Sequence, residues 1–281
     1  MPEYPLPNLV VIGAMKCGTT SLHYNLDLHP DIAMSREKEL GFFLGETEWN
    51  KGLAWYCRQF PQGTPWRGES TPGYARLPYS EGAAARMHQT IPHARLVYMV
   101  RSPVERIISH YVHSTAIGQE WRPIEEALSG FEACDYVQRS RYFYQLSEYL
   151  RYYDASRIHV ATLESLRENP GRLMGEIFRF LGVDDGFTSP QFSMVRHKSS
   201  QKGKKNRAGL MLKWLSNTRA AKIFSTDFRM RMGRILYKPF SRKIERPVLG
   251  QPVRQELLDY LEDDIAGLEA HTGLDLGHWR N

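Results

Sequence analysis

A glycine-rich loop near the start of the chain carries residue types that bind phosphate. Gly13 and Gly18 enclose four residues, which is the glycine spacing of loops that cradle phosphate between a strand and a helix. Backbone N–H groups in such a loop, and at the start of the helix after it, attract anions. Lys16 adds a positive charge inside the loop, and three hydroxyl side chains follow at 19–21. The pattern predicts a site for a phosphate-bearing ligand.

The lysine does not stand where ATP-binding loops place it. In those loops Lys follows the second glycine, and an Asp at the end of a neighbouring apolar strand holds magnesium. Here Lys16 lies inside the loop, and the strongest apolar run, Ala94–Val100, ends in Arg101. A cation there predicts a second anionic group on the ligand in place of a metal ion. An ATP-dependent kinase stays an alternative, and magnesium dependence would support it.

Arg101 has a second polar residue within reach. Ser109 follows it by eight residues, about two turns into a helix that begins with Pro103 in its first turn. Open α/β sheets bind ligands beyond the carboxyl ends of their strands. We therefore expect Arg101 and Ser109 to converge on one anionic group at that edge.

These residues need a parallel sheet to bring them together. Apolar runs typical of buried strands lie at 8–14, 31–35, 94–100 and 157–166. Helical patterns follow three of them: from Thr19 or Thr20 to about Leu28, from Pro103, and from about Pro170 to Leu181. Alternating strands and helices predict an α/β fold, with a parallel sheet flanked by helices.

Composition and charge are those of a globular protein with one unusual segment. The 281 residues are 42% hydrophobic and 24% charged, with a net charge of +6. Residues 196–246 hold 16 Lys and Arg against two acids, so they carry +14 and the rest of the chain −8. We predict one domain: an α/β core at 9–195, a basic lid or loop segment at 196–250, and a closing helix at 251–281.

The cysteines and the first apolar run bear on location. Three scattered cysteines are too few for a disulfide framework, and their spacing does not suggest a metal site. The first apolar run starts at about Leu9, which leaves no room for a signal peptide or membrane anchor. These features predict a cytoplasmic protein that uses no metal. Its oligomeric state cannot be predicted from them.

Four motifs in order resemble one enzyme family. "IGAMKCGTTSL…LHPDI", "KELGFF", "GESTPGYA" and "VRSPVERIISHY" are similar to sulfotransferases that use 3′-phosphoadenosine 5′-phosphosulfate (PAPS), above all the heparan-sulfate type and related bacterial enzymes. The resemblance runs from about Leu9 to Tyr111 and resumes weakly at 196–204 and in the C-terminal helix. It implies a P-loop-like fold and PAPS as the sulfuryl donor, with adenosine 3′,5′-bisphosphate (PAP) as its product.

The resemblance also implies roles for individual residues. Lys16 would stabilise the leaving oxygen, and Glu39 would act as the base; Glu37 and His110 are competitors, and a simple surface pair of Glu39 with Lys38 or Arg36 is the structural alternative. The residues implied to bind the donor are Lys16, Cys17, Gly18, Thr19, Thr20, Ser21, Arg101, Ser109, Lys202, Gly203 and Lys204. Those implied to line the acceptor site are Phe42, Thr71, Tyr74, His110 and His113.

The leading hypothesis is thus in-line sulfuryl transfer to an acceptor hydroxyl, or less favourably an amine. The acceptor is open: a small molecule, a glycolipid or a saccharide. Besides a kinase, a non-enzymatic binder of anionic surfaces is an alternative, because segment 196–246 is so basic. No recognised base-reading motif is present, so we expect no nucleic-acid partner. A membrane-surface contact through 196–246 stays open.

Overall fold

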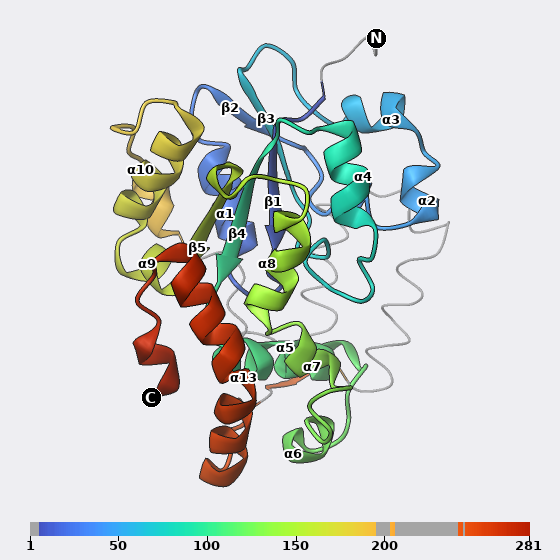
Figure 1. Ribbon diagram of the computed structural model, residues 1–281, viewed down its shortest axis with the longest axis vertical. Helices are drawn as coiled ribbons and strands as arrows, with labels where there is room; N and C mark the ends of the chain where they lie inside the picture. The colour runs from blue at the N-terminus through green and yellow to red at the C-terminus, as the bar shows by residue number, and fades with distance from the viewer. Residues whose placement is uncertain (1–5, 195–202, 206–240, 244) are drawn as a thin grey trace.

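Five parallel strands form one sheet at the centre of the molecule (Figure 1). The computed structural model describes residues 6–194, 203–205, 241–243 and 245–281. The strand order is β2-β3-β1-β4-β5, with every neighbouring pair parallel. The strands are β1 (Leu9–Gly13), β2 (Ile32–Met34), β3 (Trp66–Ser70), β4 (Arg95–Val100) and β5 (Ile158–Thr162). The predicted P-loop-like sheet is confirmed.

Helices cover both faces of this sheet. Figure 1 shows α1 behind the strands and α8 with α13 in front of them. The helices are α1 (Thr19–Leu26), α2 (Glu46–Trp49), α3 (Leu53–Cys57), α4 (Ala83–Thr90), α5 (Pro103–Ile117), α6 (Ile124–Ala127), α7 (Asp135–Gln138), α8 (Tyr142–Leu150), α9 (Leu163–Glu168), α10 (Pro170–Leu181) and α13 (Gln251–Thr272). Short 3₁₀ turns lie at Ala155–Arg157, Pro190–Ser193 and Gly277–Arg280.

Three of the four predicted strands are confirmed within one residue at each end, and the fourth, predicted at 157–166, ends at Thr162 because α9 begins at Leu163; β3 was missed. Its sequence, Trp-Arg-Gly-Glu-Ser, lacks the apolar run of a buried strand, yet Glu69 and Ser70 are fully buried. Hydroxyl and imidazole partners satisfy both side chains: Ser70 pairs with His23, and Glu69 accepts from three hydroxyl groups. Hydrogen bonding therefore replaces hydrophobicity in this strand.

The predicted threonine cap of α1 is wrong. Gly18 is the capping residue, with a left-handed φ of 85° and no side-chain cap, and the helix ends at Leu26, two residues earlier than expected. A Cβ at Gly18 would lie 2.7 Å from Leu163 Cδ1, so the position excludes larger residues. Because glycine makes this turn, neither Thr19 nor Thr20 has to cap the helix.

The predicted closing helix is confirmed as α13. Leu257, Leu261, Ile265 and Leu268 are buried on one face of it, and it packs beside α8. The Asp264 carboxylate accepts hydrogen bonds from the backbone N–H groups of Phe143 and Tyr144 at 3.0 and 2.8 Å. This contact supplies free N–H groups in the first turn of α8 with an acceptor, so α13 fixes α8 against the sheet.

The basic segment 196–250 lies mostly outside the described residues. Two short strands within it, β6 (Gly203–Lys205) and β7 (Ser241–Lys243), pair antiparallel, and β6 lies beside α5. No helix of the described residues is long and apolar enough to cross a membrane. The division of the chain into core, basic segment and closing helix stays a prediction.

Gly13 provides a direct test of the packing around β1. A Cβ there would lie 2.7 Å from a ring carbon of Tyr98 and 2.8 Å from the Ala75 Cβ, both in the core. We predict that Gly13→Ala lowers the free energy of unfolding by about 1–3 kcal/mol, because the core has no room for the methyl group. Denaturant unfolding measures this. Gly171→Ala is the matched control: its Cβ would meet only Asn169 Oδ1 at 3.8 Å, so an equal loss there would contradict the explanation.

Candidate active site

A cleft of about 1090 Å³ opens at the carboxyl edge of the sheet. The segments that follow all five strands contribute side chains to it, together with α5 and with Arg139, which follows α7. Its polar and charged lining is Lys16, Thr19, Thr20, Ser21, Glu39, Thr71, Arg76, Arg101, Ser109, His113, Arg139, Arg167, Glu168, Ser193 and Arg246. Six of these are Lys or Arg and only two are acids, so the cleft suits an anionic ligand.

The β1–α1 loop forms one wall of the cleft. Its Lys16 has a left-handed φ of 76°, and Lys16, Gly18 and residues 19–21 all line the cleft. The Ala14 N–H donates to the Met99 carbonyl of β4 at 2.6 Å, which ties the loop to the neighbouring strand. Because α1 begins here, its free N–H groups and positive dipole end lie at the same wall. The loop is therefore built as an anion site.

Arg101 lies at the end of β4 and connects to that loop. Its side chain is nearly buried; Nη1 donates to the Lys16 carbonyl at 3.4 Å, and Nη2 pairs with Glu105 at 2.9 Å. The same Glu105 carboxylate pairs with Arg246 at 2.5 Å. Ser109, two turns along α5, lines the same cleft. The structure thus brings Arg101 and Ser109 to one cleft, as their spacing suggested.

Glu39 also faces the cleft, from the loop after β2. Its backbone has a left-handed φ of 66°, its N–H donates to the Ser70 carbonyl at 3.0 Å, and its side chain is 62% exposed. Lys38 Nζ donates to the Glu39 carboxylate at 3.0 Å and to the Thr19 hydroxyl at 3.5 Å. Glu39 therefore forms the ion pair with Lys38 that a purely structural role would require, and its side chain also lines the cleft. Glu37 is exposed and does not line it.

Lys38 links Glu39 to the phosphate-type loop. Burial lowers the pKa of its ammonium group, and the adjacent Glu39 carboxylate opposes that shift. Lys38 also lies within electrostatic range of the buried Glu69. Because the Lys38 ammonium group lies between the Glu39 carboxylate and the Thr19 hydroxyl, it holds the Glu39 side chain in position although that side chain is exposed.

Of the expected acceptor-site residues, Thr71 and His113 line the cleft, whereas Phe42, Tyr74 and His110 lie behind its wall. Phe42 stacks on Tyr56 with ring centroids 4.2 Å apart. Tyr74 donates to Glu69 at 2.8 Å, and so does Thr71 at 2.6 Å. Burial raises the pKa of the Glu69 carboxyl group against these hydroxyl donors. This polar cluster fixes Thr71 from behind.

His110 is buried on α5 against Tyr136, with Nδ1 3.4 Å from Arg106 Nη2. Burial strongly lowers its pKa, and the nearby Arg106 lowers it further. His110 is therefore neutral at physiological pH and is directed into the core. This placement does not support its candidacy as a competing base.

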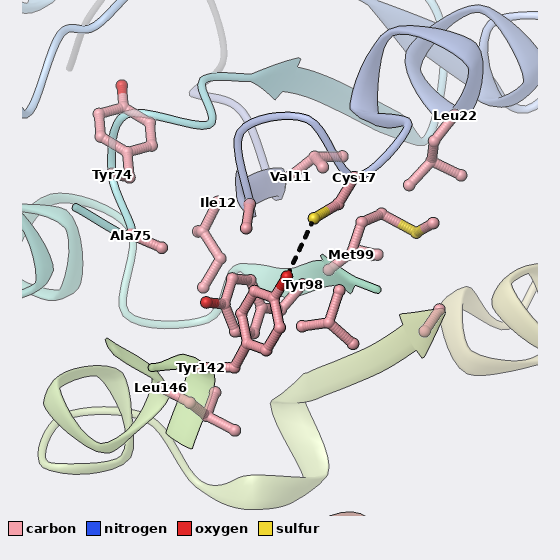
Figure 2. Packing of buried hydrophobic residues seen from close by; sticks show 14 of the residues in the cluster. Val11, Ile12, Cys17, Leu22, Tyr74, Ala75, Tyr98, Met99, Tyr142 and Leu146 are labelled. Carbon is pink, nitrogen blue, oxygen red and sulfur yellow. Dashed lines mark hydrogen bonds between the residues drawn. The ribbon is translucent and has the colours of Figure 1, made fainter. Parts of the chain in front are cut away.

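Cys17 points into the core although its neighbours line the cleft. Its Sγ lies 3.6 Å from the Tyr142 hydroxyl, beside Tyr98 (Figure 2). Burial raises the pKa of the thiol to about 11, and the hydrogen bond with Tyr142 opposes the shift. Its side chain therefore serves packing, and only its backbone belongs to the loop.

The remaining residues expected to bind the donor, from the basic segment, are described only in part. Lys202 is outside the described residues. Gly203 and Lys204 belong to β6, whose backbone alone is described. Their contribution stays a prediction.

A model of the sulfotransferase domain family matches residues 6–233 of the chain. The chain belongs to this family.

Relatives and solved structures of sulfotransferases are similar to it. A membrane-associated sulfotransferase of Dictyostelium discoideum is 40% identical over 111 residues, covering 38% of this chain and 22% of the relative. A bifunctional heparan sulfate N-deacetylase/N-sulfotransferase of Drosophila melanogaster is 30% identical and covers 63% and 20%. The chain thus spans about a fifth of the length of these relatives. A sulfotransferase crystal structure from Alicyclobacillus acidocaldarius superposes with a TM-score of 0.70 at 24% identity, covering 99% of this chain and 100% of that one.

Sequence reasoning missed several cleft residues of this sulfotransferase-family chain, among them three arginines. Arg76 follows β3, Arg139 follows α7, and Arg167 lies on α9. Burial and then the proximity of Arg101 lower the pKa of the Arg167 guanidinium. None of the three stands in a motif with diagnostic spacing, so only their common position in the fold identifies them.

The placement of Cys17 predicts an unreactive thiol. All three cysteines are buried and free. With a pKa of about 11, roughly a thousandth of the Cys17 thiol is ionised at pH 8, whereas an ordinary cysteine is partly ionised there. We predict that the native protein reacts with a chromogenic disulfide reagent at least ~100-fold more slowly than the protein unfolded in guanidinium. One equivalent of fast-reacting thiol in the native protein would contradict this placement.

Proposed function

We propose that the protein transfers the sulfuryl group of PAPS to a hydroxyl or amine of its acceptor. The observation that carries this proposal is the contact between Arg101 and the Lys16 carbonyl, which joins two anion sites in one cleft. PAPS has two anionic ends, a 5′-phosphosulfate and a 3′-phosphate. A loop with a lysine and a separate arginine at the end of the adjacent strand match that pair.

The donor would lie with each end on one of these sites. The β1–α1 loop would hold the 5′-phosphosulfate through its N–H groups, Lys16 and the hydroxyl groups that follow. Arg101 and Ser109 would hold the 3′-phosphate, and that contact would distinguish PAPS from ATP. Arginine suits this role because its planar fork donates two parallel hydrogen bonds to phosphate.

Glu39 supplies the base in this proposal. It accepts the proton of the acceptor hydroxyl as the acceptor oxygen forms a bond to sulfur. At the same time the bond between sulfur and the 5′-phosphate oxygen breaks, and PAP departs with the electron pair. Lys16 neutralises the charge that develops on that leaving oxygen. Lys38 keeps the Glu39 carboxylate in position through the 3.0 Å contact.

The acceptor class follows less directly from the family. One relative is named for N-sulfation of heparan sulfate, so an amine and a saccharide both belong among the candidates for this chain, beside a glycolipid or small molecule. The cytoplasmic location, and the role of 196–246 as a lid, an acceptor wall or a membrane contact, stay predictions.

Binding of PAP tests the donor assignment. We predict that PAP binds without metal, that AMP binds at least ~10-fold more weakly, and that Arg101→Ala removes this difference, since the charge-assisted contact to the 3′-phosphate is worth about 1.5–3 kcal/mol. Calorimetric titration of wild type and variant measures all three constants. Arg58→Ala, an exposed arginine outside the cleft, is the control. Tighter binding of ATP with magnesium than of PAP would overturn the donor assignment.

The base assignment has its own test. Glu39→Gln keeps the shape of the side chain but cannot accept the proton, so we predict that kcat falls about 10²–10⁴-fold while PAP affinity stays unchanged. The measurement is release of PAP at saturating donor with an acceptor found by screening. Glu37→Gln, two residues away and outside the cleft, should keep its activity. Equal activity of wild type and Glu39→Gln would exclude Glu39 as the base.

A further inference from the structure

Arg76 lines the cleft and has no anionic partner among the residues that the structure describes. The Arg76 side chain forms no ion pair or hydrogen bond with any residue that the structure describes, and its Nε is buried. Its guanidinium stacks on the Tyr79 ring, 4.5 Å from the centroid. A partly buried guanidinium without an acceptor is costly unless a ligand supplies one.

A second arginine lies beside it. Arg139 is 7% exposed, lines the same cleft, and has its guanidinium 5.8 Å from the centroid of the same Tyr79 ring. Asp135 pairs with Arg139 through both oxygens of its carboxylate. Asp135 thus neutralises Arg139, and no carboxylate of the described residues pairs with Arg76, so the two arginines together carry a net positive charge.

The turn that carries Arg76 is held in place. The Arg76 N–H donates to the Ser80 hydroxyl at 3.0 Å, and the Leu77 N–H donates to Gln145 Oε1 of α8 at 2.7 Å. On the other side, Arg139 Nη1 lies 3.7 Å from the sulfur of Met15, the residue before Lys16. Arg139 thus lies beside the loop that carries Lys16.

We propose that Arg76 and Arg139 form a subsite for an anionic group on the acceptor, a carboxylate, sulfate or phosphate placed near the hydroxyl or amine that is sulfated. This inference rests on the proposed function. The loop and Arg101 already match the two anionic ends of the donor. Arg246 shares Glu105 with Arg101, and Arg167 lies within electrostatic range of Arg101. Arg76 and Arg139 are therefore the cations of the described cleft that are left for the acceptor. The ring of Tyr79, which is 62% exposed, lies against the Arg76 guanidinium and limits how that planar fork can turn.

The subsite makes the enzyme selective for charge. An acceptor with the same reactive group and no anion would leave the Arg76 guanidinium without an acceptor in the cleft, whereas an anionic acceptor supplies one. Recognition by paired polar groups discriminates far more strongly than apolar fit does. The fork geometry also fixes the distance between the anion and the reacting oxygen.

Binding of three matched glycosides to the PAP-saturated protein tests the proposal. The probes are methyl β-glucoside, methyl β-glucuronide and methyl β-glucoside 6-sulfate, titrated calorimetrically at constant ionic strength. We expect at least one anionic glycoside to bind ~10-fold or more tightly than the neutral one, and Arg76→Gln to remove that preference. The glycoside that gains most identifies the anion as carboxylate or sulfate.

Further variants separate this subsite from the rest of the cleft. Arg76→Lys keeps the charge without the fork and should retain part of the preference, while Arg58→Gln, at an exposed arginine outside the cleft, should retain all of it. Equal binding of the three glycosides to wild type would overturn the proposal, and so would a preference that survives Arg76→Gln or disappears equally in Arg58→Gln. Loss of PAP affinity in Arg76→Gln would also overturn it, by making Arg76 a donor ligand. The donor assignment fails separately, if Arg101→Ala leaves PAP affinity unchanged.

Discussion

Crowded positive charge at one edge of the sheet is the constraint on which the site depends. Like charges about 4 Å apart repel by about 4 kcal/mol at an effective dielectric near 20, so cations packed into one cleft need shared anions. Glu105 is placed between Arg101 and Arg246, Asp135 faces Arg139, and Glu39 faces Lys38. Each of these carboxylates fixes its cation before any ligand arrives. Anionic ligands are then bound by groups that need little reorganisation.

The parallel sheet explains why the charges meet there. Every strand of the five-stranded sheet runs the same way, so the segments that follow β1 to β5 all begin at the same edge of the sheet. β1 is the central strand, entirely buried, and its Gly13 lies so close to Tyr98 that the following loop is held against β4. Position in the sheet, more than local flexibility, therefore sets where Lys16 and Arg101 lie.

Local spacing predicted the parts of the site that depend on chain continuity. The loop with Lys16 and the pair Arg101 and Ser109 could be found because a strand, a turn and a helix follow one another directly. Arg76 and Arg139 could not, since their common position depends on how the turn after β3 packs on α8 and how α7 packs on α5. The strand β3 was missed for a related reason: its buried Glu69 is satisfied by hydroxyl groups outside the strand, and no apolar run marks the strand in the sequence.

Motif membership is a weaker guide to side chains than to backbone. Cys17 stands between two cleft residues, yet its side chain turns into the core toward Tyr142. Phe42 and Tyr74 lie within quoted motifs, but they form the packing behind the cleft wall. A motif records which residues a loop needs in order to fold as well as those that meet the ligand. Whether a side chain is buried distinguishes residues needed for folding from residues that contact the ligand, and only the tertiary structure shows which side chains are buried.

The contact between Arg101 and the Lys16 carbonyl has a consequence for how the two anion sites work together. Arg101 can meet a phosphate only from the position that this carbonyl and Glu105 hold for it. Lys16, in turn, keeps its left-handed backbone in a loop tied to β4 through Ala14 and Met99. We therefore expect displacement of either residue to displace the other, and under the proposed function a ligand on one site would order the second. A donor with anionic groups at both ends gains from that coupling, whereas a ligand with one anionic end engages only half of it.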